Sequence, residues 1–274
     1  MEAVVPILGL VVGVIVILFK SLVPHHLKNV AVDGSKVLVE KLLGRIDREF
    51  GRLLGTDRAQ NVVVQLGMGG AGKTTLIRQL IGDPNANADV ETTTFSVYKR
   101  HSTIEGGDGR KIDTSVIIAD YRGQDFSTLI RGILDHTKTG REFRAGNINT
   151  ILFVIDIFPP GNPGRDQDMH EQPDYDRLRR NVQYWNEDKV QEIFNSFTDR
   201  GSLKNVILFV NKCDLLLAHN RKELIAPHIE PLVSCIRRHT ASLLVEPLVL
   251  YGSVKTGDGV WLLIDRILRT AVYA

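Results

Sequence analysis

The stretch that decides the fold runs from Asn61 to Thr75 and reads NVVVQLGMGGAGKTT. The part up to Leu66 is a mostly apolar run rich in valine, which is typical of a buried β-strand. The part after it contains G-x-x-x-x-G-K-T, and the residues that follow Thr75 favour a helix. Strand, glycine-rich loop and helix in this order predict a phosphate-binding loop in an α/β domain. A chance glycine-rich turn is the alternative, and it would leave the flanking strand and helix unexplained.

Each residue type in this loop has a physical task in holding a nucleoside triphosphate. The glycines let the backbone curl so that successive N–H groups point at the β-phosphate, where the helix N-terminus adds its partial positive charge. We expect Lys73 to reach the β- and γ-phosphates and the Thr74 hydroxyl to bind a bridging Mg²⁺. The nucleotide-binding residues expected here are Gly67, Met68, Gly69, Gly70, Ala71, Gly72, Lys73, Thr74 and Thr75.

Two later segments indicate that the base is guanine. The apolar run 206–210 leads into Asn211, Lys212, Cys213 and Asp214, an N-K-x-D sequence placed where open α/β sheets bind ligands. A carboxylate there can accept hydrogen bonds from N1–H and the 2-amino group of guanine, donors that adenine does not offer in that arrangement. Adenine would leave this charge unpaired, so Asp214 disfavours an ATP-driven enzyme. The strand-like segment 247–251 then leads to Ser253, Val254 and Lys255, which resemble the S-A-K element that contacts guanine in small GTPases. This resemblance makes them the second group of expected base contacts.

In this order the motifs resemble those of Ras-superfamily small GTPases, over about residues 61–274. The closest similarity is to the group of ADP-ribosylation factors and the signal recognition particle receptor β-subunit, the latter because an apolar N-terminal segment precedes the domain. The resemblance implies a P-loop NTPase (G domain) with about six mostly parallel strands and helices on both faces. It also implies GTP or GDP and Mg²⁺ as ligands.

The resemblance further assigns residues to the switch regions. The sequence DYRGQ at 120–124 matches the D-x-x-G-Q pattern, so Asp120 is expected to hold magnesium through a water and Gly123 to sense the γ-phosphate. Gln124 is expected to orient the attacking water, which makes it a catalytic residue together with Lys73. Thr92 is the expected switch threonine that binds magnesium, with Thr93 as the alternative.

No arginine finger can be assigned from the sequence. Arg122 lies inside the switch and Arg165 in a loop, and both are expected to be ordinary surface residues. Turnover should therefore be slow unless a GTPase-activating partner supplies the missing charge.

The N-terminal segment is the most apolar part of the chain. Residues 3–19 include no charged or polar side chain, and the apolar character continues to Val23, a length close to what a membrane-spanning helix needs. A cleaved signal peptide is the rival interpretation, but Glu2 stands where a basic residue is usual and residues 24–26 offer no small-x-small cleavage site. A buried core helix is the third possibility.

Charge orients the expected span. Lys20, Lys28 and Lys36 follow it and no basic side chain precedes it, so the positive-inside rule places the rest of the chain in the cytosol. Two cysteines, Cys213 and Cys235, are compatible with that reducing compartment and too few for a disulfide scaffold or a four-ligand zinc site.

Three parts of the chain follow from these patterns: an anchor at 1–23, a connector at 24–60 and a GTPase domain at 61–274. Apolar residues three and four apart predict a helix over 35–55 in the connector. This helix would pack on the domain or lie at the membrane, or it would pair with itself or a partner. The loop at 158–174 is either solvated or a partner-binding segment.

The remaining elements of the domain follow from periodicity. Segments 94–100 and 112–119 predict a hairpin across the glycine-rich turn at 106–109. Helices are expected over 175–198, over 222–242 with a break or kink at Pro227 and Pro231, and over 258–272. The histidines include no pair at ligand spacing on one helical face.

Composition limits the function further. A hydrophobic fraction of 43% with 24% charged residues excludes a disordered chain, and a net charge of +2 gives no reason to expect nucleic acid as a partner. The sequence therefore predicts a membrane-anchored GTP-binding protein that hydrolyses GTP as a molecular switch. The alternative is a GTP-loaded structural receptor subunit that recruits a protein partner with little turnover.

Overall fold

A computed structural model describes residues 59–82, 96–105, 111–120, 148–161, 169–197, 202–217 and 220–273. These residues belong to a compact unit that extends from Arg58 to Ala274. The predicted span at 3–23 and the predicted helix at 35–55 lie outside the described residues. Among the helices that are described, none combines the length and the apolar character that crossing a membrane requires.

The core of the unit is one six-stranded sheet in the order β2-β3-β1-β4-β5-β6. Its strands are β1 (Ala59–Leu66), β2 (Ser96–Glu105), β3 (Lys111–Asp120), β4 (Ile148–Asp156), β5 (Asn205–Asn211) and β6 (Leu248–Tyr251). Only β2 runs antiparallel to its neighbour, β3, and the other neighbouring strands are parallel. The predicted six-stranded, mostly parallel sheet and the predicted hairpin are both confirmed.

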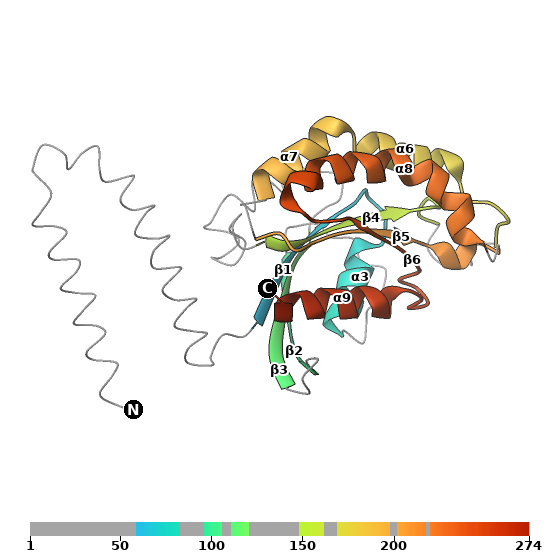
Figure 1. The fold of residues 1–274 in the computed structure, drawn as a ribbon. Helices are drawn as coiled ribbons and strands as arrows, with labels where there is room; N and C mark the ends of the chain where they lie inside the picture. The colour runs from blue at the N-terminus through green and yellow to red at the C-terminus, as the bar shows by residue number, and fades with distance from the viewer. Residues whose placement is uncertain are drawn as a thin grey trace, which may run out of the picture. The chain divides into compact units, whose positions relative to one another are not determined.

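Helices cover both faces of this sheet (Figure 1). One face carries α3 (Lys73–Ile81) and α9 (Val260–Tyr273), and the other carries α6 (Tyr175–Tyr184), α7 (Glu187–Phe197) and α8 (Arg221–Thr240). Short 3₁₀ turns follow β5 at Cys213–Leu215 and α8 at Ala241–Leu243. Because the parallel strands are covered on both sides, they can carry long apolar runs, as β5 does between its terminal asparagines.

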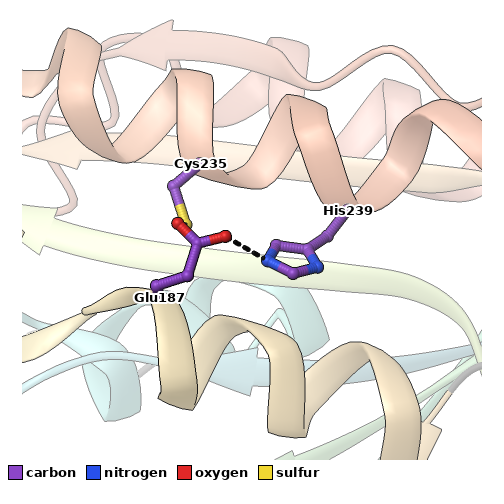
Figure 2. Close-up of side chains that lie close together, drawn as sticks. All are labelled: Glu187, Cys235 and His239. Carbon is purple, nitrogen blue, oxygen red and sulfur yellow. Dashed lines mark hydrogen bonds and ion pairs between the residues drawn. The ribbon is translucent and has the colours of Figure 1, made fainter.

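The first turn of α7 is joined to α8 by one acidic side chain. The Glu187 carboxylate contacts Cys235 and His239 near the end of α8 (Figure 2). It also contacts Arg238 of the same helix. These contacts hold two helices of the same layer together at the surface.

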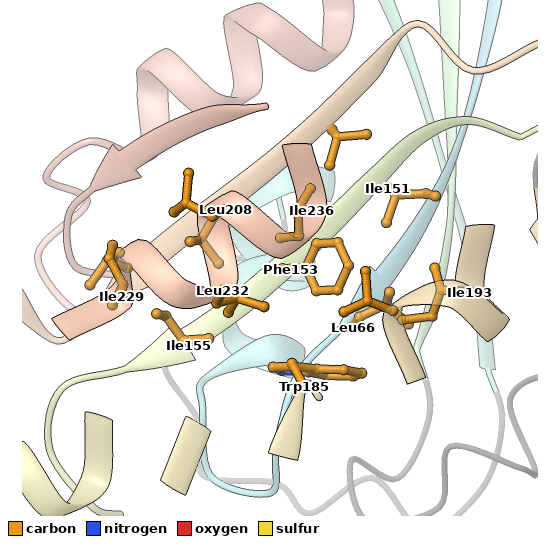
Figure 3. Close-up of a cluster of buried hydrophobic side chains, with 14 of the residues drawn as sticks. Leu66, Ile151, Phe153, Ile155, Trp185, Ile193, Leu208, Ile229, Leu232 and Ile236 are labelled. Carbon is orange, nitrogen blue, oxygen red and sulfur yellow. The ribbon is translucent and has the colours of Figure 1, made fainter. Parts of the chain in front are cut away.

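Side chains from successive strand residues enter different cores. Val62, Val64 and Leu66 pack on the side of α6, α7 and α8, whereas Val63 packs on the side of α3 and α9. Figure 3 shows the first core, where Phe153 of β4 lies against Trp185, with ring centroids 5.5 Å apart at an edge-to-face angle of 86°. This alternation fixes the register of β1 and thereby the place where its last residue meets the glycine-rich loop.

The single helix predicted over 175–198 is wrong, because the structure has two helices there. Trp185 follows α6 with φ −91° and ψ 58°, which is not helical, and its side chain is buried. Asn186 then caps the start of α7, since its side-chain oxygen accepts a hydrogen bond from Lys189 N at 3.2 Å. Burying the indole against Phe153 turns the chain, so packing overrides the helical periodicity.

The predicted break at Pro227 or Pro231 is also not observed, because α8 is one helix from Arg221 to Thr240. Both prolines are exposed. A proline at position i removes the hydrogen bond to the carbonyl at i−4, so Pro231 leaves the carbonyl of Pro227 without its helical donor. Placing both prolines on the solvent side lets water replace the lost bonds, and the helix continues.

Candidate nucleotide-binding site

The carboxyl ends of the parallel strands meet at one edge of the sheet, and the predicted motifs lie at that edge. The glycine-rich loop, residues 67–72, connects β1 to α3 there. Gly70 and Gly72 have positive φ angles of 76° and 89°, which side chains rarely adopt. The N-cap of α3 is Gly72, so no side chain caps this helix, and a helix N-terminus favours an anion.

Close neighbours explain why several of these positions are glycine. A Cβ on Gly67 would lie 2.5 Å from the carbonyl oxygen of Val154, and one on Gly72 would lie 2.4 Å from Asn211 Nδ2. A Cβ on Gly70 would lie 2.7 Å from Pro160 Cγ, so the segment after β4 packs directly on the loop. The loop is therefore held close to backbone and side chains of its neighbours.

Lys73, the first residue of α3, folds back over the loop. Its buried ammonium donates to the carbonyl oxygens of Gly67 at 3.0 Å and Met68 at 3.1 Å. An ammonium with three donors that is held inside the curve of a glycine-rich loop has the chemistry expected for phosphate binding. Thr74 and Thr75 follow it in the first helical turn, both half-buried.

Asn211, the last residue of β5, joins the loop to the predicted base-binding segments. Its buried side chain donates from Nδ2 to the carbonyl of Ala71 at 2.8 Å and accepts at Oδ1 from Val254 N at 2.9 Å. Cys213 N donates to the carbonyl of Gly252 at 3.0 Å, which ties the two base-binding segments to each other. One amide therefore sets the spacing of three loops that are far apart in the sequence.

The segment after β6 is organised by a buried hydroxyl. Ser253 Oγ accepts from the backbone N–H groups of Lys255 at 3.1 Å and Thr256 at 3.3 Å. Gln79 of α3 donates to the carbonyl of Val254, so the helix after the glycine-rich loop also contacts this segment. The side chain of Lys255 is exposed.

Asp214 is half-buried, and within the described part of the chain its carboxylate makes no hydrogen bond or ion pair. It follows Lys212, whose φ of 68° turns the chain out of β5. A carboxylate with acceptors available at this edge has the chemistry that guanine recognition needs.

Lys212 contacts a neighbouring strand end, an arrangement that the sequence pattern does not reveal. Its ammonium donates to Asp156 Oδ2 at 2.9 Å and to the carbonyl of Phe158 at 2.7 Å. Burial lowers the pKa of Lys212 below its usual value, and the Asp156 carboxylate opposes that shift. The pair therefore keeps a buried charge compensated beside the site.

Asp156, the last residue of β4, is fully buried and holds two cations and an amide. Arg177 Nε donates to its Oδ1 at 2.8 Å, and Asn181 Nδ2 lies 3.2 Å from the same oxygen. Arg177 also donates from Nη2 to the carbonyl of Gly69 at 3.0 Å. This group, Asp156 with Arg177, Lys212 and Asn181, is called the Asp156 cluster below, and it connects the glycine-rich loop to the N-K-x-D segment.

Sequence reasoning missed the Asp156 cluster. The available signal was an aspartate that directly ends a buried strand, because a carboxylate at such a position needs a partner. Arg177, in the first turn of the next helix, was a candidate for that partner. Asp156 and Arg177 are far apart along the chain, so the sequence does not show that they are in contact.

Burial also determines the chemistry of Cys213. It raises the pKa of this thiol to about 11, and Sγ donates to the carbonyl of Val210 at 3.3 Å. Cys213 is therefore a packed structural residue and not a reactive one at neutral pH.

The predicted switch residues are described only in part. Asp120 ends β3, where its backbone lies opposite Ser96, and β3 is the parallel neighbour of β1. Its position at the same edge as the glycine-rich loop agrees with a role near phosphate-bound magnesium. Thr92, Thr93, Gly123 and Gln124 lie outside the described residues, as do Arg122 and Arg165.

The donor set at this edge suits a Mg²⁺–nucleotide complex. Magnesium prefers oxygen ligands and shares them with substrate phosphates, and the half-buried Thr74 places a hydroxyl in the first turn of α3. The positive-φ glycines and the uncapped helix N-terminus supply the phosphate cradle beside it.

No curated protein matches the chain. Among solved structures, Roco2 RocCORdC of Methanosarcina barkeri bound to GDP is 17% identical with a TM-score of 0.42, and the match covers 79% of this chain and 50% of that one. This chain thus spans half the length of that protein.

The family model described as 50S ribosome-binding GTPase matches residues 62–212, which include the glycine-rich loop and reach Lys212 of the N-K-x-D segment. The fold agrees with this match, since the matched region extends from within β1 to the end of β5 and includes the glycine-rich loop. The chain belongs to this P-loop GTPase family.

Proposed function

We propose that the protein is a membrane-anchored GTPase that hydrolyses GTP to GDP and phosphate as a molecular switch on the cytosolic face. The observation that carries the proposal is the pair of hydrogen bonds through which Asn211 joins Ala71 of the phosphate loop to Val254 of the last base-binding segment. This link brings phosphate-binding and guanine-selecting chemistry to one site.

In the proposed mechanism the protein positions its substrate and adds little covalent chemistry. The backbone N–H groups of residues 69–73 hold the phosphates, and Lys73 exchanges carbonyl partners for phosphate oxygens. Gln124 orients the attacking water. Thr74, Asp120 and Thr92 would hold Mg²⁺, which neutralises charge on the phosphate oxygens.

The Asp156 cluster would keep the site in its binding geometry. Arg177 holds the carbonyl of Gly69, and Asp156 holds both Arg177 and Lys212. The phosphate loop and the N-K-x-D segment are therefore linked to the same buried carboxylate. Displacement of either segment should change the position of the other. Arg177 is a positioning residue in this account.

The membrane anchor, the switch role and the closeness to the ADP-ribosylation factor group rest on the sequence. The apolar residues 3–23 and the lysines after them support a span with the GTPase domain in the cytosol. A protein effector and a GTPase-activating partner are expected, because no arginine finger is assigned. The family description mentions the 50S ribosome, but a net charge of +2 gives no support for an RNA-binding surface on this chain.

The test uses the full chain purified in detergent. GTP, GDP and ATP binding is measured by competition against a fluorescent guanine nucleotide, and single-turnover hydrolysis is measured with Mg²⁺. We expect GTP and GDP to bind at least about 1000-fold more tightly than ATP, as a site built around buried polar recognition allows. A preference for ATP would overturn the proposal.

Three variants separate the steps. Asp214→Asn should reduce guanine selectivity and favour xanthine nucleotides, because an amide can donate to the 2-oxo group of xanthine. Lys73→Ala should weaken triphosphate binding, and Gln124→Leu should slow hydrolysis while leaving GTP bound. If wild-type protein binds GTP tightly but turns it over no faster than Gln124→Leu, the structural receptor subunit is the correct function.

A further inference from the structure

A second cluster of chemically distinctive side chains lies away from the nucleotide site, on the outer surface between α7 and α8. Glu187 is the first residue of α7, while Cys235 and His239 are four residues apart on α8, so one face of that helix presents both (Figure 2). One oxygen from the carboxylate, the thiol sulfur and one ring nitrogen all lie within 4.8 Å of one another.

We propose that Glu187, Cys235 and His239 bind a single Zn²⁺ ion, with water in the fourth position. Thiolate, imidazole and carboxylate are the three ligand types that zinc uses in proteins, and three protein ligands with a water form a familiar open zinc site. Hard cations such as Mg²⁺ and Ca²⁺ are disfavoured, because they take oxygen ligands and would gain little from sulfur.

The three ligand atoms lie near the separations that this ion needs. Zinc–ligand bonds of about 2.0–2.3 Å in a tetrahedron place neighbouring ligand atoms about 3.3–3.8 Å apart. Here Cys235 Sγ lies 3.4 Å from Glu187 Oε2, and His239 Nε2 lies 2.8 Å from Glu187 Oε1. Small side-chain rotations therefore suffice to open the cluster around an ion.

The three proposed ligands differ in how far they are exposed to solvent, as an accessible metal site requires. The thiol is buried, with Cys235 5% exposed, whereas the side chains of His239 and Glu187 are 20% and 50% exposed. The carboxylate and the imidazole are therefore the ligands that solvent reaches, and the sulfur is the buried one. The packing of α7 against α8 holds the ligands on two rigid helices.

A simple surface ion pair accounts for only part of this arrangement. Arg238 and His239 both contact Glu187, and acidic residues are common in the first turn of a helix. That interpretation gives no role to the buried thiol that donates to the same carboxylate. With zinc bound, the charges of thiolate and carboxylate offset the ion. Arg238 contacts Oε2 of Glu187, so Oε1 can bind the ion while that contact is kept.

A catalytic cysteine is the other alternative, and the cluster argues against it. A nucleophilic thiol needs a neighbour that stabilises the thiolate, but a carboxylate beside Cys235 acts in the opposite direction. Burial and Glu187 together raise the pKa of Cys235 to about 11. A divalent cation reverses this effect: the S–H bond breaks, a sulfur–zinc bond forms and the proton passes to solvent, with no change in oxidation state.

The test uses full-length protein in detergent, without a polyhistidine tag, after treatment with a chelator. Co²⁺ is the probe, because a cobalt–thiolate bond gives a charge-transfer absorption in the near ultraviolet and tetrahedral cobalt absorbs in the visible. We expect saturation at one equivalent of Co²⁺, displacement of the signal by one equivalent of Zn²⁺, and no effect of excess Mg²⁺.

Variants assign the ligands. Cys235→Ala should abolish the charge-transfer band, and His239→Gln and Glu187→Gln should weaken cobalt binding by at least about 100-fold. Matched controls are Cys213→Ala, which removes the other thiol, and His228→Gln, which removes an exposed histidine of the same helix. Both controls should retain the band.

Two outcomes would overturn the proposal: wild-type protein that shows no charge-transfer band, or a band that persists in Cys235→Ala. If Cys235→Ala fails to fold, as judged by circular dichroism, His239→Gln decides, since it keeps the thiol and its unchanged cobalt affinity would also refute the site. Guanine-nucleotide binding is measured on the same samples, and its retention in His239→Gln separates this site from the nucleotide site.

Discussion

Asp156 and Glu187 are both carboxylates with three side-chain partners, but they lie in different surroundings. Asp156 is fully buried at the end of β4 and contacts Arg177, Lys212 and Asn181. Glu187 is half-exposed at the start of α7 and contacts Cys235, Arg238 and His239, a group called the Glu187 cluster below. The comparison isolates the effect of burial on a carboxylate with several partners.

Because the Asp156 cluster is buried, the stability of the fold depends on every charged member of it. Removing one member leaves the others charged in a medium that solvates them poorly, so each loss is costly. In the Glu187 cluster, water replaces any partner that leaves, and the contacts are screened by salt. The first cluster is therefore suited to holding a binding site in one geometry, and the second is suited to exchanging a partner for a metal ion.

The largest expected effect is that of Asp156→Ala. This change leaves Arg177 and Lys212 as buried cations without their carboxylate, so the free energy of unfolding should fall by about 3–5 kcal/mol. Urea unfolding followed by circular dichroism measures the loss. Glu187→Ala is the matched control and should cause a much smaller loss of unfolding free energy. Equal losses in the two variants would contradict the inference that burial makes the Asp156 contacts more important for stability than those of Glu187.

Arg177→Met should have the next largest effect. It removes a buried charged donor from Asp156 and from the carbonyl of Gly69, with an expected loss of about 2–3 kcal/mol in unfolding free energy. Nucleotide affinity should fall as well, because the phosphate loop loses a contact.

A double-mutant cycle checks the cause. Asp156→Ala combined with Arg177→Met should cost less than the sum of the single changes, since the arginine no longer remains unpaired. Additive losses would show that the two side chains act independently.

Features that are encoded by contiguous residues could be predicted from the sequence. The strands β1, β4 and β5 were predictable because both faces of the sheet are covered, which makes each strand a continuous apolar run. The glycine-rich loop and the N-K-x-D segment were predictable because their residues are contiguous. The match to a GTPase family confirms the prediction of a P-loop GTPase domain.

Contacts between segments were not predictable in the same way. The link from Arg177 to Gly69 depends on how α6 docks on the sheet. The end of α6 depends on Trp185 packing against Phe153, which no local periodicity encodes. For the Glu187 cluster a local signal did exist, since a cysteine and a histidine four residues apart share one helical face, but a search limited to histidine pairs misses it.

A smaller effect is expected on the chemistry of Cys235. Glu187→Gln removes a negative charge beside the thiol, so the pKa of Cys235 should fall from about 11 towards its usual value, although burial keeps it raised. The pH at which iodoacetamide alkylates Cys235 at half its maximal rate should therefore move downwards in the variant. The measurement is made with a chelator by peptide mass spectrometry.

Cys213 serves as the internal reference in this experiment. Its raised pKa arises first from burial, and Glu187 is not among its causes, so its alkylation profile should not move. A shift of both cysteines would point to a general loosening of the fold and not to the removed charge.

The smallest expected effect is a dependence on salt. Raising the ionic strength from about 0.1 M to about 1 M shortens the Debye length from about 10 Å to about 3 Å. The stability difference between wild type and Glu187→Ala should shrink towards zero over this range. The difference for Asp156→Ala should persist, because solvent ions do not reach a fully buried carboxylate; loss of that difference at high salt would contradict the comparison.

The packing of Trp185 also has a spectroscopic consequence. The chain has two tryptophans: Trp185 is 1% exposed and Trp261, on α9, is 69% exposed. In a Trp261→Phe variant, fluorescence would come from one indole, located between the helix that carries Arg177 and the helix that begins at Glu187. Its emission wavelength and its quenching by iodide would then report, in solution and without a label, on the segment that connects the two carboxylate clusters.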